Sequence, residues 1–282
     1  MRVSTVVPVF NRAHTVARAI DSALRQVCDA AVEVILVDDG SSDDLAAVLK
    51  PYGNRVTVIR HARNSGAAAA RNTGVAAASG DYVAFLDSDD AWLPGKLARQ
   101  IEAMRRNKWA ASCTAFQLVR PRAPDIVAPR YSEGPLQLAD LVWGCFVSPG
   151  STLVFERRVF DEIGPLDTRL GRLEDWDWLL RYAQSSTLGF ISEPLARILA
   201  SSHSDAAAVL SALETLRAKH LPQLERRDRR SFAAALDFER AGALYRAGNR
   251  ASALPMLLRS CLRSPLGHPA LSAVLHNRRA WS

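Results

Sequence analysis

The sequence predicts an α/β protein of three layers, in which helices cover both faces of a central, mostly parallel sheet, with a helical extension at the carboxyl end. Strand-like and helix-like segments alternate through the first 90 residues, a pattern typical of parallel strands joined by right-handed crossovers. After residue 204 the chain becomes rich in Ala, Leu and Arg, and only helical patterns remain. We therefore expect a domain over 1–204 and a second, helical one over 205–282.

Four strands and three helices are predicted in the first 90 residues. Runs of β-branched and apolar residues indicate the strands, and apolar residues at helical spacing indicate the helices. The strands are expected over 3–10, 32–37, 56–60 and 82–87, and the helices over 15–26, 43–49 and 67–78. The last strand is an apolar run between Gly80 and a group of acids, which is typical of a buried strand.

The pattern is more mixed between residues 94 and 204. Helical spacing is found over 94–107 and 174–184, and strand-like runs over 112–119 and 151–155. The segment 120–135 contains four prolines and is expected to be an exposed loop.

Composition limits the class of protein. With 282 residues, 48% hydrophobic and 23% charged, the chain resembles an ordinary globular protein with a sizeable core. Its four cysteines are scattered without a C-x-x-C pair, which favours a reducing compartment over a disulfide frame or zinc site. No apolar run approaches 18 residues, and the opening segment fits a first strand better than a signal peptide. We therefore predict a cytoplasmic protein.

Positive charge is concentrated in the last quarter of the chain. Residues 206–282 contain 13 Lys and Arg against 5 Asp and Glu, a surplus of +8, so that residues 1–205 carry about −1 of the net +7. Because the aromatic-rich segments are acidic, no nucleic-acid partner is expected. The basic extension, with four arginines at 226, 227, 229 and 230, has two interpretations: peripheral contact with an anionic membrane, or a solvated helical cap.

Three carboxylates follow the predicted strand 82–87 within four positions. In extended chain, side chains two apart point the same way, so Asp87 and Asp89 converge where the strand leaves the core. Two convergent carboxylates suit a hard divalent cation, and ligands of open α/β sheets bind at this edge. The alternative is a surface turn that is acidic by chance.

Polar residues also follow the other predicted strands. Asp38 and Asp39 can accept a hydrogen bond from a base or a ribose hydroxyl, or can serve a turn and helix cap. Arg71, one turn into a helix, can reach a diphosphate or lie on a solvated helix face. Neither a Walker A loop nor a G-x-G-x-x-G sequence is present.

Four segments in this order resemble a known family. VVPVFN, VDDGSSDD, N-x-G-x(4)-RN-x-G and GDYVAFLDSDD are similar to the donor-binding half of family-2 glycosyltransferases, whose nucleotide-sugar fold is called GT-A. The resemblance covers about residues 1–200 and is densest over 1–95. It implies a donor half over 1–95 and an acceptor half over 96–204.

The resemblance also implies roles for single residues. Pro8, Asn11, Asp38 and Asp39 would flank the base and ribose, and Arg71 would lie near the phosphates. Asp87 and Asp89, with Ser88 between them, would bind ribose and a divalent cation, Mn²⁺ or Mg²⁺, which stabilises charge on the departing nucleoside diphosphate.

The family pattern extends to an acidic pair before an aromatic helix, matched by Glu174 and Asp175. Asp175 would take the proton of the acceptor hydroxyl, with Glu174 in support. The alternative is a helix start enriched in acids. Many members continue with R-x-H, but here Leu199 stands in the place of the histidine, and His203 is a possible substitute as a metal ligand.

The sequence thus predicts an inverting, metal-assisted, hexosyltransferase-like enzyme. It would move a sugar from a nucleoside diphosphate, UDP favoured, to an acceptor hydroxyl in bacterial surface polysaccharide or lipopolysaccharide synthesis. The acceptor would be a saccharide or lipid-linked. Two alternatives stay open: a transferase to polyprenyl phosphate, and a non-catalytic subunit that binds sugar nucleotides.

Overall fold

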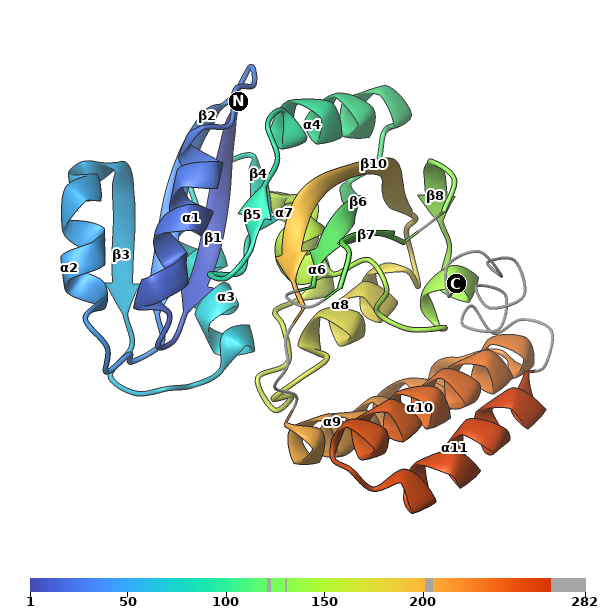
Figure 1. Cartoon of the computed structure of the whole chain (residues 1–282). Helices are drawn as coiled ribbons and strands as arrows, with labels where there is room; N and C mark the ends of the chain where they lie inside the picture. The colour runs from blue at the N-terminus through green and yellow to red at the C-terminus, as the bar shows by residue number, and fades with distance from the viewer. Residues whose placement is uncertain (121–122, 130, 201–204, 265–282) are drawn as a thin grey trace. The chain divides into compact units, whose positions relative to one another are not determined.

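A computed structural model of the chain describes residues 1–120, 123–129, 131–200 and 205–264 (Figure 1). The contacts between residues divide the chain into two compact units. The first comprises 1–136, 146–168 and 185–200, and the second comprises 137–145, 169–184 and the described residues from 205 onward. The described helices include none with the length and hydropathy that a membrane crossing requires.

The first unit is built on one sheet with the strand order β3-β2-β1-β4-β9-β6-β10-β5, to which β7 and β8 add at β6 and β10. The strands are β1 (Arg2–Val9), β2 (Ala31–Asp38), β3 (Val56–Arg60), β4 (Tyr82–Phe85), β5 (Ala91–Trp92), β6 (Ala111–Val119), β7 (Ile126–Ala128), β8 (Gly134–Leu136), β9 (Val154–Glu156) and β10 (Leu188–Leu199). β1 to β4 are mutually parallel, and β9 runs against both of its neighbours, β4 and β6. The predicted α/β class is confirmed, and the pairs between described strands are mixed, four parallel and five antiparallel.

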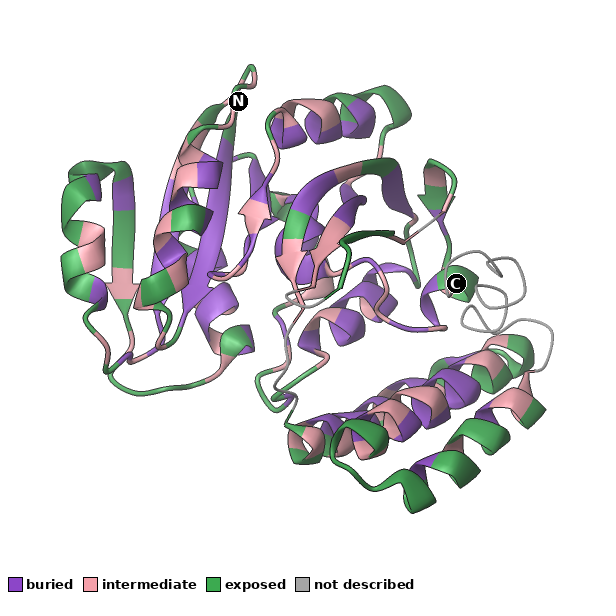
Figure 2. Ribbon diagram, viewed as in Figure 1, coloured by how far each residue is buried: buried purple, intermediate pink, exposed green. Residues whose placement is uncertain are grey.

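Helices of the first unit connect these strands. They are α1 (Ala13–Leu24), α2 (Leu45–Leu49), the 3₁₀ helix η1 (Lys50–Arg55), α3 (Ala67–Ala77), α4 (Lys96–Asn107), α6 (Pro149–Thr152) and α7 (Arg157–Ile163). The residues of α1 that face the sheet are buried, as are nearly all residues of β1 and β4 (Figure 2). This burial follows from the apolar content of those segments, because apolar area removed from water is the main stabilising contribution.

Two details of the predicted elements were wrong. Ser151 and Thr152 belong to the short helix α6, and the strand begins only at Val154, because Pro149 favours a first helical turn. The proline-rich segment predicted to be a loop contributes β7 and β8 to the sheet. Pro135, the middle residue of β8, pairs there with Gly189, and β8 adds to the sheet as an edge strand, where a missing amide hydrogen is tolerated.

The second unit is helical. Its members are α5 (Leu138–Leu141), α8 (Glu174–Tyr182), α9 (Ala206–His220), the 3₁₀ helix η2 (Leu221–Gln223), α10 (Arg226–Arg246) and α11 (Arg250–Arg263). Asp205 caps α9 by accepting from the amide of Ala208, and Asn249 caps α11 in the same way from Ser252. The helical extension predicted after residue 204 is therefore confirmed over its described residues, and it groups with α8.

Candidate functional site

The carboxyl ends of β1, β2 and β4 lie side by side. β1 pairs in parallel with both neighbours, with Val9 opposite Asp38 and Val6 opposite Phe85. The loops that follow these strands therefore meet at one edge of the sheet, where ligands of open α/β sheets bind. The structure brings Pro8, Asn11, Asp38, Asp39, Asp87, Ser88 and Asp89 to this edge.

Asn11 joins the first two loops. Its backbone takes the left-handed conformation (φ 51°), its amide donates to Ser41 Oγ (3.0 Å), and its side-chain oxygen accepts from the Ser42 amide (2.8 Å). The Ala13 amide adds a bond to Asp43 Oδ2 (2.7 Å). Asn tolerates this backbone region better than most residues, which explains its use here. The two loops consequently form one wall of the edge.

The adjacent acids Asp38 and Asp39 are both buried but have different partners. Asp39 accepts from the amides of Ser65 and Gly66 (2.8–3.0 Å) and lies 2.7 Å from His61 Nδ1. Asp38 Oδ1 accepts from the Ser41 amide (2.8 Å), while Asp38 Oδ2 is 3.3 Å from Arg60. Asp39 therefore holds the loop that leads into α3. Asp38 instead lies beside an exposed guanidinium, that of Arg60.

Arg71 is buried and forms an ion pair with Asp87. Its Nη2 lies 2.6 Å from Asp87 Oδ1, and its guanidinium carbon lies 5.7 Å from the centroid of the Phe85 ring. The alternative of a solvated helix face is thus excluded. Gly150 covers the pair so closely that a Cβ there would lie 2.5 Å from Asp87 Oδ2 and 2.9 Å from Arg71 Nη2. Only glycine fits this position without displacing the pair.

Asp89 and Asp90 follow Asp87 in the chain, and Asp89 is the more accessible of the two. Its side chain is 31% exposed and its Oδ2 lies 3.6 Å from Arg12 Nε, while its carbonyl accepts from Arg18. Asp90 is buried, accepting from Ser151 Oγ (2.5 Å) and from the Leu199 amide (2.9 Å). Burial, assisted by the nearby charge of Asp87, raises the pKa of Asp90 to about 7.

One of these contacts bears on a residue singled out in the sequence. Leu199, which stands where the family pattern has histidine, reaches the acidic strand end through its amide. The hydroxyl of Ser151 accepts from the Asp87 amide (3.1 Å) and donates to Asp90. His203 lies outside the described residues. The contact of Asp90 was not predicted, because three carboxylates within four positions give no sign of which one is buried.

Glu174 and Asp175 begin α8 in the second unit. Leu173 precedes them in the left-handed conformation (φ 63°), and Asp175 Oδ1 accepts from the Trp176 amide (2.8 Å). Glu174 is buried and Asp175 half-buried. Carboxylates in a first helical turn are favoured by the helix dipole, which lowers the cost of keeping Asp175 charged at the helix start.

The two tryptophans that follow lie in the core. Trp176 donates from Nε1 to the Leu141 carbonyl (2.8 Å) and meets Phe232 edge to face at 5.4 Å. Trp178 stacks on Tyr182 at 5.8 Å with an interplanar angle of 3°. Both are buried, so neither ring offers an exposed face on which a sugar could stack.

Asp177, which sequence reasoning passed over, is fully buried between α8 and α9. Its carboxylate lies 2.8 Å from Lys219 Nζ, 2.7 Å from His220 Nε2 and 3.0 Å from Arg181 Nε. Burial raises the pKa of Asp177, but the hydrogen bonds from His220 and Lys219 outweigh this and hold the pKa below its ordinary value. The helix that begins with Glu174 and Asp175 is therefore anchored to the C-terminal helices by a charge network.

The acidic strand end offers oxygen ligands alone. Among the described residues, no three His, Cys, Asp or Glu side chains form a group able to enclose a metal ion. The carboxylates of Asp87 and Asp89 suit a hard cation such as Mg²⁺ or Mn²⁺. With only two protein carboxylates, such an ion would complete its shell with phosphate oxygens and water, which is how Mg²⁺ is usually held beside nucleotides.

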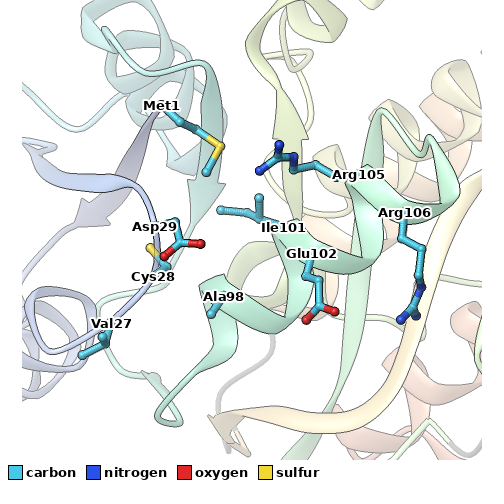
Figure 3. A pocket seen from close by; sticks show the side chains of 9 residues that line it. All are labelled: Met1, Val27, Cys28, Asp29, Ala98, Ile101, Glu102, Arg105 and Arg106. Atoms are coloured by element: carbon cyan, nitrogen blue, oxygen red, sulfur yellow. The ribbon is translucent and has the colours of Figure 1, made fainter.

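A separate hollow of about 710 Å³ lies at the amino edge of the sheet (Figure 3). It is lined by Met1, Val27, Cys28, Asp29, Ala98, Ile101, Glu102, Arg105 and Arg106. Met1 precedes β1, whereas the polar residues described above follow the strands at their carboxyl ends. This hollow is therefore distinct from the edge that bears the acids.

Lys96 supports the acidic edge from within the core. It is fully buried, its Nζ lies 4.1 Å from the centroid of the Trp92 ring, and Trp92 Nε1 donates to the Ser151 carbonyl (2.8 Å). Lys96 Nζ has no hydrogen-bond partner among the described residues. Burial lowers the pKa of Lys96 to about 7.

Solved structures identify the class of fold. The mannosyltransferase PcManGT from Pyrobaculum calidifontis, in complex with GDP-Man and Mn²⁺, superposes with a TM-score of 0.61 at 19% identity, covering 98% of this chain and 79% of that one. The fold is that of the GT-A glycosyltransferases, as the sequence predicted.

The family follows from the sequence comparison. A model of glycosyl transferase family 2 matches residues 4–164, and the chain belongs to this family. A glycosyltransferase of Rickettsia prowazekii is 29% identical over 207 residues, covering 69% of this chain and 63% of its own length. The UDP-Glc:alpha-D-GlcNAc-diphosphoundecaprenol beta-1,3-glucosyltransferase WfgD of Escherichia coli is 42% identical over 106 residues, 37% of this chain and 42% of WfgD. The chain thus spans less than two thirds of these relatives.

Replacing Lys96 with Met should change how stability depends on pH. The unfolded chain binds a proton at Lys96 below about pH 10.5, whereas the folded chain releases it above about pH 7. Between these values the free energy of unfolding of the wild type therefore rises with pH. Urea titrations at several pH values should show the stability advantage of K96M over the wild type shrinking by about 1–3 kcal/mol across this window. Lys50→Met, at an exposed lysine, should show no such trend; parallel pH profiles for K96M and the wild type would contradict the assignment.

Replacing Asp177 with Asn should destabilise the second unit strongly. Removing one member of a buried charge network leaves the others uncompensated, a loss of about 2–4 kcal/mol here because Lys219 and Arg181 can still reach water. Glu214→Gln, which removes the exposed pair with Arg240, should cost less than about 1 kcal/mol. Chemical unfolding monitored by circular dichroism compares the two. Equal losses would show that the Asp177 network contributes no more than a surface pair.

Proposed function

We propose that the chain is an inverting glycosyltransferase that moves a hexosyl group from a nucleoside-diphosphate sugar to a hydroxyl of a glycan acceptor in the synthesis of a bacterial surface polysaccharide. The observation that carries the proposal is the meeting, at one sheet edge, of the strand-end acids with the ion pair between the buried Arg71 and the partly exposed Asp87. A buried cation beside accessible carboxylates is suited to a polyanionic ligand that arrives with a metal ion.

The donor would lie along the ends of β1, β2 and β4. Asp38 and the loop of Pro8 and Asn11 would contact the base and ribose. Asp39 would contribute indirectly, by fixing the loop that leads into α3. Arg71 is permanently charged and forks toward oxygens, so it would contact the diphosphate. UDP is the favoured nucleotide, supported by the UDP-Glc in the name of the Escherichia coli relative.

Asp87 and Asp89 would hold Mn²⁺ or Mg²⁺. A cation held there would neutralise charge that develops on the departing nucleoside diphosphate. The Mn²⁺ in the structure of the Pyrobaculum enzyme supports this choice. Asp89 is the better candidate for a direct ligand, since among the described residues the cation that pairs with it is the exposed Arg12 at 3.6 Å, whereas Asp87 lies 2.6 Å from Arg71.

Asp175 would act as the general base. It would accept the proton of the acceptor hydroxyl while the oxygen attacks the anomeric carbon from the side opposite the leaving diphosphate. One C–O bond forms as the other breaks, and the configuration of the sugar inverts. Glu174, buried beside it, would support the charge and position of the helix start.

The acceptor is proposed to be a sugar carried on a lipid at the cytoplasmic face of the membrane. Support comes from the diphosphoundecaprenol-linked acceptor in the name of the Escherichia coli relative and from the basic C-terminal helices, which would lie on the anionic surface. The alternative, transfer to polyprenyl phosphate itself, differs in product: a sugar phosphodiester and not a disaccharide, which mass spectrometry distinguishes. A non-catalytic subunit would bind UDP but give no product.

Replacing Asp89 with Asn should remove the effect of the metal on nucleotide binding. An amide is a poorer ligand than a carboxylate for a hard cation, so UDP should bind roughly tenfold or more weakly in the presence of Mn²⁺. Isothermal titration calorimetry with UDP, with and without Mn²⁺, measures the change. Asp81→Asn, at the other end of β4, serves as the control. Unchanged Mn²⁺-dependent binding of UDP to D89N would remove Asp89 from the metal site.

Replacing Asp175 with Asn should leave UDP affinity near that of the wild type and lower turnover roughly 10²–10⁴-fold, the usual contribution of a positioned general base. Turnover is measured as transfer to a soluble glycan acceptor, with the anomeric configuration of the product read by NMR. Asp161→Asn, at an exposed acid of α7, provides the matched control. Loss of UDP binding with turnover nearly intact would assign Asp175 to the donor site, and retained configuration would refute inversion.

A further inference from the structure

The solvent-facing side of α11 is apolar. Leu254, Leu258 and Leu262 follow one another at four-residue spacing along this side, with exposed fractions of 58%, 56% and 80%. Leu257, one turn after Leu254, is also exposed. We call Leu254, Leu257, Leu258 and Leu262 the leucine face. Much of α11 is coloured as exposed in Figure 2. A helix on the surface of a globular protein ordinarily turns such a stripe inward, so the leucine face requires an explanation.

The orientation of α11 is fixed by its contacts with α10. Ser260, fully buried, donates to the Ala234 carbonyl (2.7 Å), and Arg263 pairs with the buried carboxylate of Asp237 at 2.9 Å. Arg259 approaches the same carboxylate at 3.5 Å. Turning α11 to hide its leucines would break these bonds and leave Asp237 buried with fewer partners, which is strongly unfavourable.

Positive charge borders both ends of the leucine face. α11 contains three arginines, Arg250, Arg259 and Arg263, and no acid. Arg250 precedes the first leucine and Arg259 lies between the last two, both exposed. Arg230 donates to the carbonyl of Arg263, which places the arginine cluster at the start of α10 beside the end of α11. The border is therefore basic at both ends of the leucine face.

This combination selects among possible partners. A second copy of the chain docking on the leucine face would bring Arg250 and Arg259 toward their own equivalents, and like charges oppose such pairing. An anionic lipid surface offers the opposite charge at its headgroups and an apolar layer just beneath them. A helix with leucines on one side and arginines along the border matches both layers.

We propose that the leucine face is a membrane-docking surface, with its leucines entering the boundary between headgroups and acyl chains and its bordering arginines contacting anionic headgroups. The inference rests on the proposed function only for the purpose of the docking surface, which is to hold the enzyme beside a lipid-linked acceptor. This mode of binding differs from purely electrostatic attraction of a basic tail to a membrane. Part of the binding comes from apolar contact, which salt does not screen.

The test is sedimentation of the full chain with vesicles of phosphatidylcholine alone or mixed equally with phosphatidylglycerol, at low and high sodium chloride. The wild type should bind the mixed vesicles and keep part of this binding at high salt. Leu258→Gln/Leu262→Gln should bind roughly tenfold or more weakly, with the salt-resistant part lost. Arg250→Gln/Arg259→Gln should lose the preference for phosphatidylglycerol. Val27→Gln, the same kind of change at an exposed position of the first unit, should bind as the wild type does.

Three results would overturn the proposal. The first is a wild type that stays in the supernatant with every vesicle, and the second is a leucine variant that binds as the wild type does. The third is a wild-type dimer, seen by size-exclusion chromatography without lipid, that the leucine variant abolishes, because this would assign the leucine face to a second copy of the chain. Circular dichroism and calorimetry with UDP and Mn²⁺ establish that each variant is folded. Sugar transfer to a soluble glycan acceptor is measured in parallel. If the protein transfers sugar but does not bind vesicles, only the membrane-docking inference is refuted. If it binds vesicles but transfers no sugar, only the proposed function is refuted.

Discussion

The ion pair between the buried Arg71 and the partly exposed Asp87 is the interaction on which the acidic edge of the sheet depends. It joins α3 to the end of β4, and Gly150 of α6 lies so close to both side chains that a larger residue would displace them. Removing Asp87 would take the carboxylate partner from a buried guanidinium, which typically costs about 3–5 kcal/mol. In the proposed function the same guanidinium serves the diphosphate, so that the pair keeps Arg71 in place before the donor binds. Preorganised charge of this kind needs little rearrangement during the reaction.

The acidic motifs contain carboxylates of two kinds. Asp39, Asp90 and Asp177 are buried and bonded to neighbouring loops or helices, whereas Asp89 and Asp175 are partly exposed. The sequence predicts the strands that carry the first two motifs and the edge where they meet, because alternating strands and helices leave few possible topologies. It does not predict which acids are buried. That choice depends on partners distant in the chain, such as Leu199 for Asp90 and His220 for Asp177.

The C-terminal helices illustrate the same limit. Composition changes only after residue 204, yet 137–145 and 169–184 group with the helices beyond it. The reason is physical: Asp177 binds Lys219 and His220, and Trp176 packs on Phe232, contacts that join residues more than 40 positions apart. The periodicity of α11 likewise predicts a helix with an apolar stripe. Which side of that helix faces α10 is decided by Ser260 and Arg263, which no pattern identifies beforehand.

Burial also determines how strongly each positive group responds to salt. Arg71 lies within the protein, where ions screen its charge little, and this suits binding of one defined polyanion. Arg250 and Arg259 lie at the surface, where attraction to a charged sheet of lipid is long-ranged but readily weakened by salt. Exposed arginines alone would therefore give only salt-sensitive attachment to a membrane. Apolar contact through the leucine face supplies a component that salt does not weaken, and for this reason the leucines and the arginines of α11 are best understood as one surface.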